Sequence, residues 1–133
     1  MLDNIDLDLK LKVLYIYTII ITLPLGLAIL IAPDLVRTLM AMPSQDPITF
    51  GITGSVYLAF GLLSILGLRA PKKFIPVLLM QFTYKVAWFI GVVFPLLIAG
   101  QFPDYGYLLV VIFITYIVGD ILVIPFSDLL AKE

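Results

Sequence analysis

The sequence predicts an all-α integral membrane protein, with four transmembrane helices that form a bundle with antiparallel neighbours and short loops. Of the 133 residues, 62% are hydrophobic and 13% are charged, whereas a soluble domain is about half apolar and about a quarter charged. The apolar residues also gather in four runs, each close to the ~20 residues that cross about 30 Å of hydrocarbon. Open strands are excluded because their backbone groups have no partners in lipid.

The expected spans are residues 13–32, 48–68, 74–99 and 107–130, and the length of the chain fits a single domain. Two shorter segments, 2–11 and 34–42, carry apolar residues at helical spacing, which is typical of helices lying on the membrane surface. For the first of them a solvated chain end fits equally well.

Prolines and small residues give further detail about the spans. Pro24, Pro95 and Pro125 each remove a backbone donor inside an expected span, as also happens in ordinary membrane helices. The second span places small residues at every fourth position (Gly51, Ser55 and Ala59). Such a face permits close helix contact, and packing inside the bundle is favoured over packing in a dimer.

Basic residues set the expected orientation. If the four helices alternate in direction, six of the seven basic residues outside the spans fall on one side of the membrane, namely Lys10, Lys12, Arg69, Lys72, Lys73 and Lys132. Only Arg37 falls on the other side. The positive-inside rule therefore predicts that both termini are cytoplasmic and that the protein resides in the cell membrane. The acidic start, with Asp3, Asp6 and Asp8, does not resemble a signal peptide.

The composition excludes several kinds of chemistry. The chain has no cysteine and no histidine, which are the commonest ligands of zinc, copper and haem, and histidine is the commonest general base. We therefore expect no metal site and no cofactor. A net charge of −1 offers no basic face to a nucleic acid.

Lys85 and Asp120 are the sharpest functional signal. Lys85 lies near the centre of the third span, and Asp120 is the only acid near the middle of an apolar run. An isolated charge at this depth costs from about 3 to over 10 kcal/mol, so it should have a partner. At 1.5 Å per residue, both side chains lie roughly 16 Å from the same membrane surface. We predict that they form a pair.

Other polar side chains share helix faces with this pair, because spacings of three, four and seven residues return to one side of a helix. The candidate site residues are Thr22, Thr53, Tyr57, Gln81, Tyr84, Trp88 and Tyr116, in addition to Lys85 and Asp120. Four of these residues (Thr22, Tyr57, Lys85 and Asp120) are expected to form one layer at the bilayer midplane.

Three interpretations of the Lys85–Asp120 pair stay open. It fixes the register of two helices as a structural ion pair, it lines a cavity for a ligand or a transported proton, or the two residues face a partner protein. No nucleophile–base pair or catalytic set is present, which argues against an enzyme. The favoured function is binding of a lipophilic molecule, or service as an accessory subunit of a larger membrane complex or homo-oligomer among the membrane lipids. The alternative is a small transporter or proton relay.

The first two spans also resemble a known group of proteins. The first span ends in Ala32-Pro33, a surface segment runs to Pro47, and the second span carries Phe50-Gly51-Ile52-Thr53-Gly54, then Gly61, then Gly67-Leu68-Arg69. This pattern is similar to the DoxX-like small four-span bacterial membrane proteins. The resemblance implies a four-helix bundle and, in some members, quinone-linked or redox partners. The segments around Lys85 and Asp120 match no motif of that group, so it assigns no functional residue.

Overall fold

A computed structural model describes residues 2–132 of the chain, with side chains from residue 5 onward. In this part of the chain the fold is all-helical, and four helices are long and apolar enough to cross a membrane: Ile5–Ile31, Pro47–Arg69, Ile75–Ile98 and Gly106–Val123. The prediction of an all-α chain with four such helices is confirmed for these residues.

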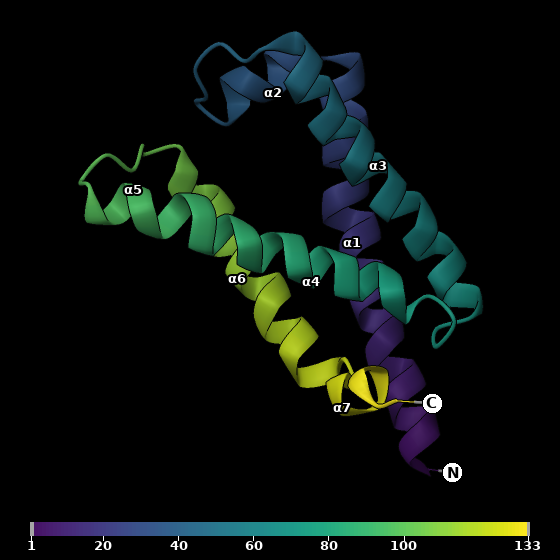
Figure 1. The fold of residues 1–133 in the computed structure, drawn as a ribbon. Coiled ribbons are helices and arrows are strands. Elements are labelled where there is room, and N and C mark those ends of the chain that lie inside the picture. Colours follow the sequence, from purple (N-terminus) through teal and green to yellow (C-terminus); the bar gives the residue numbers. More distant parts are fainter. Residues whose placement is uncertain (1, 133) are drawn as a thin grey trace.

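The helices follow one another with short connections (Figure 1). Their bounds are α1 Leu2–Ile31, α2 Pro33–Leu39, α3 Pro47–Arg69, α4 Ile75–Trp88, the π-helical turn η1 Phe89–Val93, α5 Phe94–Ile98, α6 Gly106–Val123 and α7 Phe126–Leu130. The π turn ends two residues before Pro95, which has no backbone donor, and the Phe94 N–H donates to the Phe89 carbonyl.

Two boundaries differ from the sequence-based expectation. The prediction of a separate surface helix at 2–11 is wrong, because α1 is continuous from Leu2 to Ile31. This helix also buries Leu11 and Tyr15 completely against α4 and the residues at the end of α6. The expectation that the fourth span reaches Leu130 is also wrong. The backbone at Ile124 is extended, as the residue before a proline prefers, and Pro125 separates α6 from α7.

Helices α1 and α3 run in opposite directions in very close contact, which glycines permit. A Cβ on Gly26 would meet the backbone nitrogen of Leu58 and lie 2.7 Å from the carbonyl oxygen of Gly54. A Cβ on Gly67, at the other end of α3, would lie 2.7 Å from the ring of Tyr15. The prediction that Gly51, Ser55 and Ala59 pack inside the bundle is wrong. Ser55 and Ala59 are exposed, and nothing in the described structure lies within 4 Å of a Cβ on Gly51.

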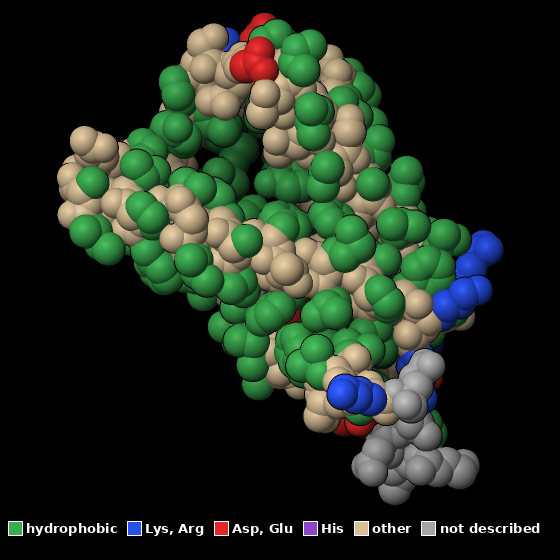
Figure 2. Space-filling model, viewed as in Figure 1, with side chains coloured by type: hydrophobic (Ala, Val, Ile, Leu, Met, Phe, Trp, Pro, Cys, Tyr) green, Lys and Arg blue, Asp and Glu red, His purple; other side chains and the backbone are tan. Residues whose placement is uncertain are grey.

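The second half of the chain diverges from this helix pair. Helices α4, η1 and α5 form one arm, which meets α1 and α3 near the chain termini and separates from them toward α2 (Figure 1). Near the termini, the Tyr15 hydroxyl donates to the Pro71 carbonyl over 2.7 Å, and Leu14, Leu78 and Ile124 close a core. Lysine and arginine side chains gather at this same end (Figure 2).

At the opposite end, α2 folds back beside the start of α3. Pro33 begins α2, and Val36 packs with Ile29 and Phe50. Asp46 caps α3, since its Oδ2 accepts the Thr49 N–H over 2.8 Å. Hydrogen bonds from the side chain and the backbone of Thr49 lower the pKa of the Asp46 carboxyl from its ordinary value of 3.8.

The glycine contacts generate a first testable expectation. Gly26→Ala should destabilise the fold by about 1–3 kcal/mol, the usual cost of overpacking, because backbone atoms of α3 cannot move aside. Gly51→Ala is the matched control and should be neutral or stabilising, since alanine favours a helix by about 1 kcal/mol over glycine. Thermal unfolding of both variants in detergent, followed by circular dichroism, measures the difference. Equal melting temperatures would contradict the close pairing of α1 and α3.

The Asp46 cap generates a second expectation, for acid conditions. Because folding lowers the pKa of Asp46, its ionised cap stabilises the fold above the unfolded pKa, and this contribution is lost as the pH falls through the folded pKa. Asp46→Asn retains a capping oxygen that does not titrate. The stability difference between wild type and Asp46→Asn should therefore favour wild type more at pH 6 than at pH 2. A difference that does not change with pH would show that this carboxyl is not the cap.

Candidate functional site

Lys85 lies in the interior, enclosed by aromatic rings. Its side chain is 1% exposed, and the ammonium Nζ lies 4.1 Å from the ring centre of Tyr116, 4.6 Å from that of Tyr84 and 5.4 Å from that of Phe113. Desolvated cation–π contacts contribute about 2 kcal/mol or more. We call these three rings the Lys85 cage. The nearest polar partner is Gln81 one turn earlier on α4, which accepts from Nζ over 3.4 Å.

The predicted direct ion pair between Lys85 and Asp120 is wrong. The ion pairs among the described side chains lie elsewhere, at Lys10–Asp6, Arg37–Asp34 and Lys72–Asp8. Tyr116 precedes Asp120 by one turn on α6, and among the aromatic rings its centre lies nearest to Nζ, at 4.1 Å. Asp120 is nevertheless 1% exposed and close enough to Lys85 for their charges to interact.

Two buried polar groups in the same interior as the Lys85 ammonium have unused hydrogen-bonding capacity. In the described part of the chain, Asp120 Oδ2 and Gln81 Nε2 are buried without a hydrogen-bond partner. A buried polar atom of this kind costs about 1–3 kcal/mol. The interior therefore holds a cation, an acid and an amide whose bonding is incomplete, which is common where a protein binds a ligand.

Two of the predicted site residues, Thr22 of α1 and Tyr116 of α6, join these helices beside the Lys85 cage. The Thr22 and Tyr116 hydroxyls share a buried hydrogen bond of 2.6 Å. The ring of Tyr17 meets the ring of Tyr116 edge-on at 4.6 Å, and the Tyr17 hydroxyl bonds the Thr115 hydroxyl on α6. Of the four residues in the predicted midplane layer, Tyr57 faces a different space, described next.

A cleft of about 450 Å³ opens between α3, α4 and α6. The surface is hollowed between the arm of α2 and α3 and the arm of α4 and α5 (Figure 2). The lining is mainly apolar and aromatic, and it consists of Ile52, Thr53, Val56, Tyr57, Tyr84, Trp88, Leu109 and Phe113. Two of these residues, Tyr84 and Phe113, also belong to the Lys85 cage, so the same rings separate the cleft from the buried ammonium.

The wall of the cleft is fixed by aromatic packing. Tyr84 stacks on Phe60 of α3, with ring centres 5.5 Å apart, and meets Phe113 of α6 edge-on at 6.0 Å. Trp88 packs edge-on against Phe113 at 5.0 Å. Thr53 satisfies its own hydroxyl by donating to the Thr49 carbonyl. The polar edge of the cleft therefore comes from the half-buried tyrosines Tyr57 and Tyr84.

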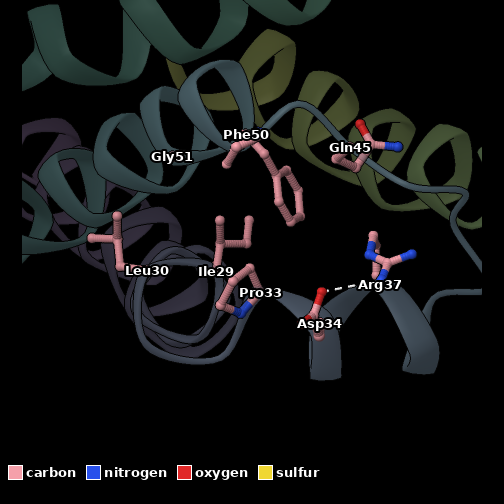
Figure 3. Close-up of a pocket in the computed structure, with 9 residues that line it drawn as sticks. Ile29, Leu30, Pro33, Asp34, Arg37, Gln45, Phe50 and Gly51 are labelled. Carbon is pink, nitrogen blue, oxygen red and sulfur yellow. Dashed lines mark hydrogen bonds and ion pairs between the residues drawn. The ribbon is translucent and has the colours of Figure 1, made fainter.

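Two smaller pockets lie toward α2. One of about 140 Å³ is lined by apolar residues of α1, α2 and α3 together with Gln45, Thr53 and Tyr57. The other, of about 190 Å³, lies where the end of α1, α2 and the start of α3 meet, and it is drawn in Figure 3. There the ring of Phe50 points into the pocket, and the ion pair between Arg37 and Asp34 lies at its edge.

The structure thus brings together most of the candidate residues in two adjoining spaces. Lys85, Gln81, Tyr116, Thr22 and Asp120 belong to the interior, whereas Thr53, Tyr57 and Trp88 line the cleft, and Tyr84 borders both. The sequence analysis missed Phe113 and Leu109. Phe113 precedes Tyr116 by three residues and Asp120 by seven, so it shares their helix face, and this spacing was a usable signal. Nothing distinguished Leu109 from lipid-facing leucines.

Comparison with family models, with curated proteins and with solved structures gave no match for this chain. The resemblance to the DoxX-like group accordingly stays a prediction.

The Thr22–Tyr116 bond generates a third expectation. Thr22→Val and Tyr116→Phe each leave the other hydroxyl buried without its partner, so each should cost about 1–3 kcal/mol. The double variant should cost less than the sum, by at least about 0.5 kcal/mol. Ser64→Ala is the control, since the Ser64 hydroxyl is also buried but bonds the Phe60 carbonyl in its own helix. Additive effects for Thr22 and Tyr116 in denaturant unfolding would contradict the bond.

Proposed function

We propose that this chain is an integral membrane protein that binds a lipophilic small molecule in the cleft between α3, α4 and α6. The observation that carries the proposal is the cleft itself, an aromatic-lined space whose back wall is the Lys85 cage. Binding sites for small molecules are concave and mostly apolar, with a few convergent polar groups, and this combination occurs here.

The exposed surface supports a membrane location. Large apolar side chains lie fully outward on several helices, including Ile98 at 87% exposed, Leu122 at 75% and Ile20 at 66%. Contiguous apolar surface of this kind is unfavourable in water and normal in lipid. By the positive-inside rule, the basic residues gathered near the termini support a cytoplasmic location for that end. The cleft then lies in the opposite half of the membrane and opens sideways toward the lipid chains.

Lys85 gives the site its electrostatic character. Its ammonium lies over the rings of Tyr84 and Phe113, and both rings also line the cleft. A bound molecule that contacts these two rings therefore lies against aromatic groups that the Lys85 ammonium polarises. In a low dielectric such an arrangement acts more strongly than in water, which favours a ligand with π-electron density or a polar end near Tyr57.

The arrangement of the cage and the cleft gives less support to the two alternative functions, a proton relay and an accessory subunit. A proton relay through Lys85 and Asp120 is favoured by their joint burial, yet aromatic rings stand between Lys85 and the cleft. An accessory subunit requires a partner-binding face, and in the described part of the chain the exposed apolar side chains are spread over α1, α3, α4, α5 and α6.

A fourth expectation tests the proposed function. Native mass spectrometry of protein extracted in mild detergent should show a discrete small added mass. Val56→Trp fills the cleft from α3 and should remove that mass, whereas Val111→Trp places the same bulk on an exposed face of α6 outside the cleft and should retain it. Lys85→Met should weaken retention, because the cage loses its cation.

Two results would contradict the proposed function. One is a wild-type protein that carries no small mass from any mild detergent. The other is a mass that survives Val56→Trp unchanged. A fixed multimer or a protein partner without any small mass would favour the accessory-subunit alternative instead.

A further inference from the structure

Two further pockets follow the cleft along α3 toward the end of the molecule near α2, and neighbouring spaces share lining residues; we call this series of spaces the track. The pocket at that end shares Ile29, Gln45 and Phe50 with the middle pocket. The middle pocket shares Thr53, Tyr57 and Leu109 with the cleft. The three spaces therefore follow one another from the first residues of α3 toward its middle, and adjacent spaces have lining residues in common.

The length of this track matches one leaflet of a bilayer. Its wall on α3 runs from Pro47 to Tyr57, which corresponds to roughly 15 Å at 1.5 Å per residue. Half of a hydrocarbon core is also about 15 Å. A molecule that occupies the whole track would therefore extend from the membrane surface to the middle of the membrane, beside the Lys85 cage.

Polarity changes along the track. Of the three spaces, only the pocket near α2 is lined by charged side chains, Asp34 and Arg37. The inner cleft is lined by apolar and aromatic residues, and three of its side chains bear a hydroxyl, namely Thr53, Tyr57 and Tyr84. In Figure 3, Arg37 and Gln45 lie on one side of the pocket, and Ile29 and Leu30 lie on the other. A track with a charged mouth and an apolar interior fits an amphiphile better than a uniformly apolar molecule.

In the pocket near α2, Arg37 is the side chain suited to binding the head group of such a molecule. A guanidinium has five N–H donors, and the structure uses one nitrogen of Arg37 for the 3.0 Å contact with Asp34. The Asp34 side chain is 90% exposed, and an exposed ion pair contributes only about 0–1 kcal/mol. Another anion can therefore replace Asp34 as the partner of Arg37 at a small cost in free energy. Guanidinium groups bind carboxylate and phosphate oxygens in a bidentate manner.

We propose that the ligand is a long-chain amphiphile whose anionic oxygen head group binds Arg37 beside Gln45 and whose chain follows α3 into the cleft beside Trp88. This inference rests on the proposed function and specifies its ligand class. A carboxylate and a phosphate share the required chemistry.

Trp88 offers a direct readout, because it is the only tryptophan in the chain and it lines the cleft. Bromine atoms in the middle of a stearic chain quench tryptophan fluorescence on contact. Purified protein in lipid nanodiscs is titrated at pH 8 with dibromostearic acid, with dibromostearyl phosphate, or with dibromostearyl alcohol. The acid and the phosphate should each quench Trp88 at roughly tenfold lower concentration than the alcohol, as expected for a charge-assisted hydrogen bond.

Three variants locate the head group. Arg37→Gln should abolish the preference for the anionic chains, and Arg69→Gln, which removes a basic residue at the other end of α3, should leave it intact. Asp34→Asn removes the competing carboxylate and should strengthen quenching by the anionic chains. This gain cannot result from misfolding. Preference for only one of the two anions would assign the head group to that class.

The outcomes separate this inference from the proposed function. Equal quenching by acid, phosphate and alcohol, or a preference that survives Arg37→Gln, overturns the head-group assignment while the cleft remains a site for lipophilic molecules. Ile52→Phe with Val56→Phe narrows the cleft, and Val118→Phe with Ile121→Phe is the matched exposed control on α6. If both double variants are quenched as strongly as wild type, the chains act from the surrounding lipid and both proposals fail.

Discussion

The buried ammonium of Lys85 constrains the arrangement of the rest of the structure. A cation within an apolar helix pair must be compensated, and here the compensation comes mainly from the faces of Tyr116, Tyr84 and Phe113 rather than from a carboxylate in contact with it. These rings come from α4 and α6, so the two helices must cross at this height. One of these rings, Tyr84, also stacks on Phe60 of α3, so an aromatic pair joins α4 to α3 beside the ammonium.

The cleft follows from an asymmetry in packing. Helices α1 and α3 approach through Gly26, Gly54 and Gly67 so closely that no Cβ fits at these positions. Helix α4 meets α3 instead through large rings, such as Tyr84 on Phe60. One half of the molecule is thus a tight helix pair, and the other is held away by aromatic side chains. The space between them is the cleft, which is where we propose that a lipophilic molecule binds.

Sequence reasoning was strongest where a single constraint dominates. The cost of unpaired backbone groups in hydrocarbon makes long apolar runs helical, and the cost of a buried charge places Lys85 and Asp120 inside; the structure has both features. It was weakest where several partners compete. An acid and three aromatic rings all satisfy an ammonium, and only the three-dimensional arrangement shows that the rings are in contact with it. Likewise, spacing marked Gly51, Ser55 and Ala59 as small, but the tight face of α3 belongs to other glycines.

The claim that a lipophilic molecule occupies the cleft is tested most directly by photolabelling. Protein in nanodiscs would be irradiated with a long-chain alkyl diazirine, and the labelled residues would be identified by mass spectrometry. The expected result is labelling concentrated on the cleft, at Tyr57, Tyr84, Trp88 and Phe113, and saturable by the unlabelled chain. Labels spread over the outward residues, such as Ile98 and Leu122, in proportion to their exposure and without saturation, would contradict the account.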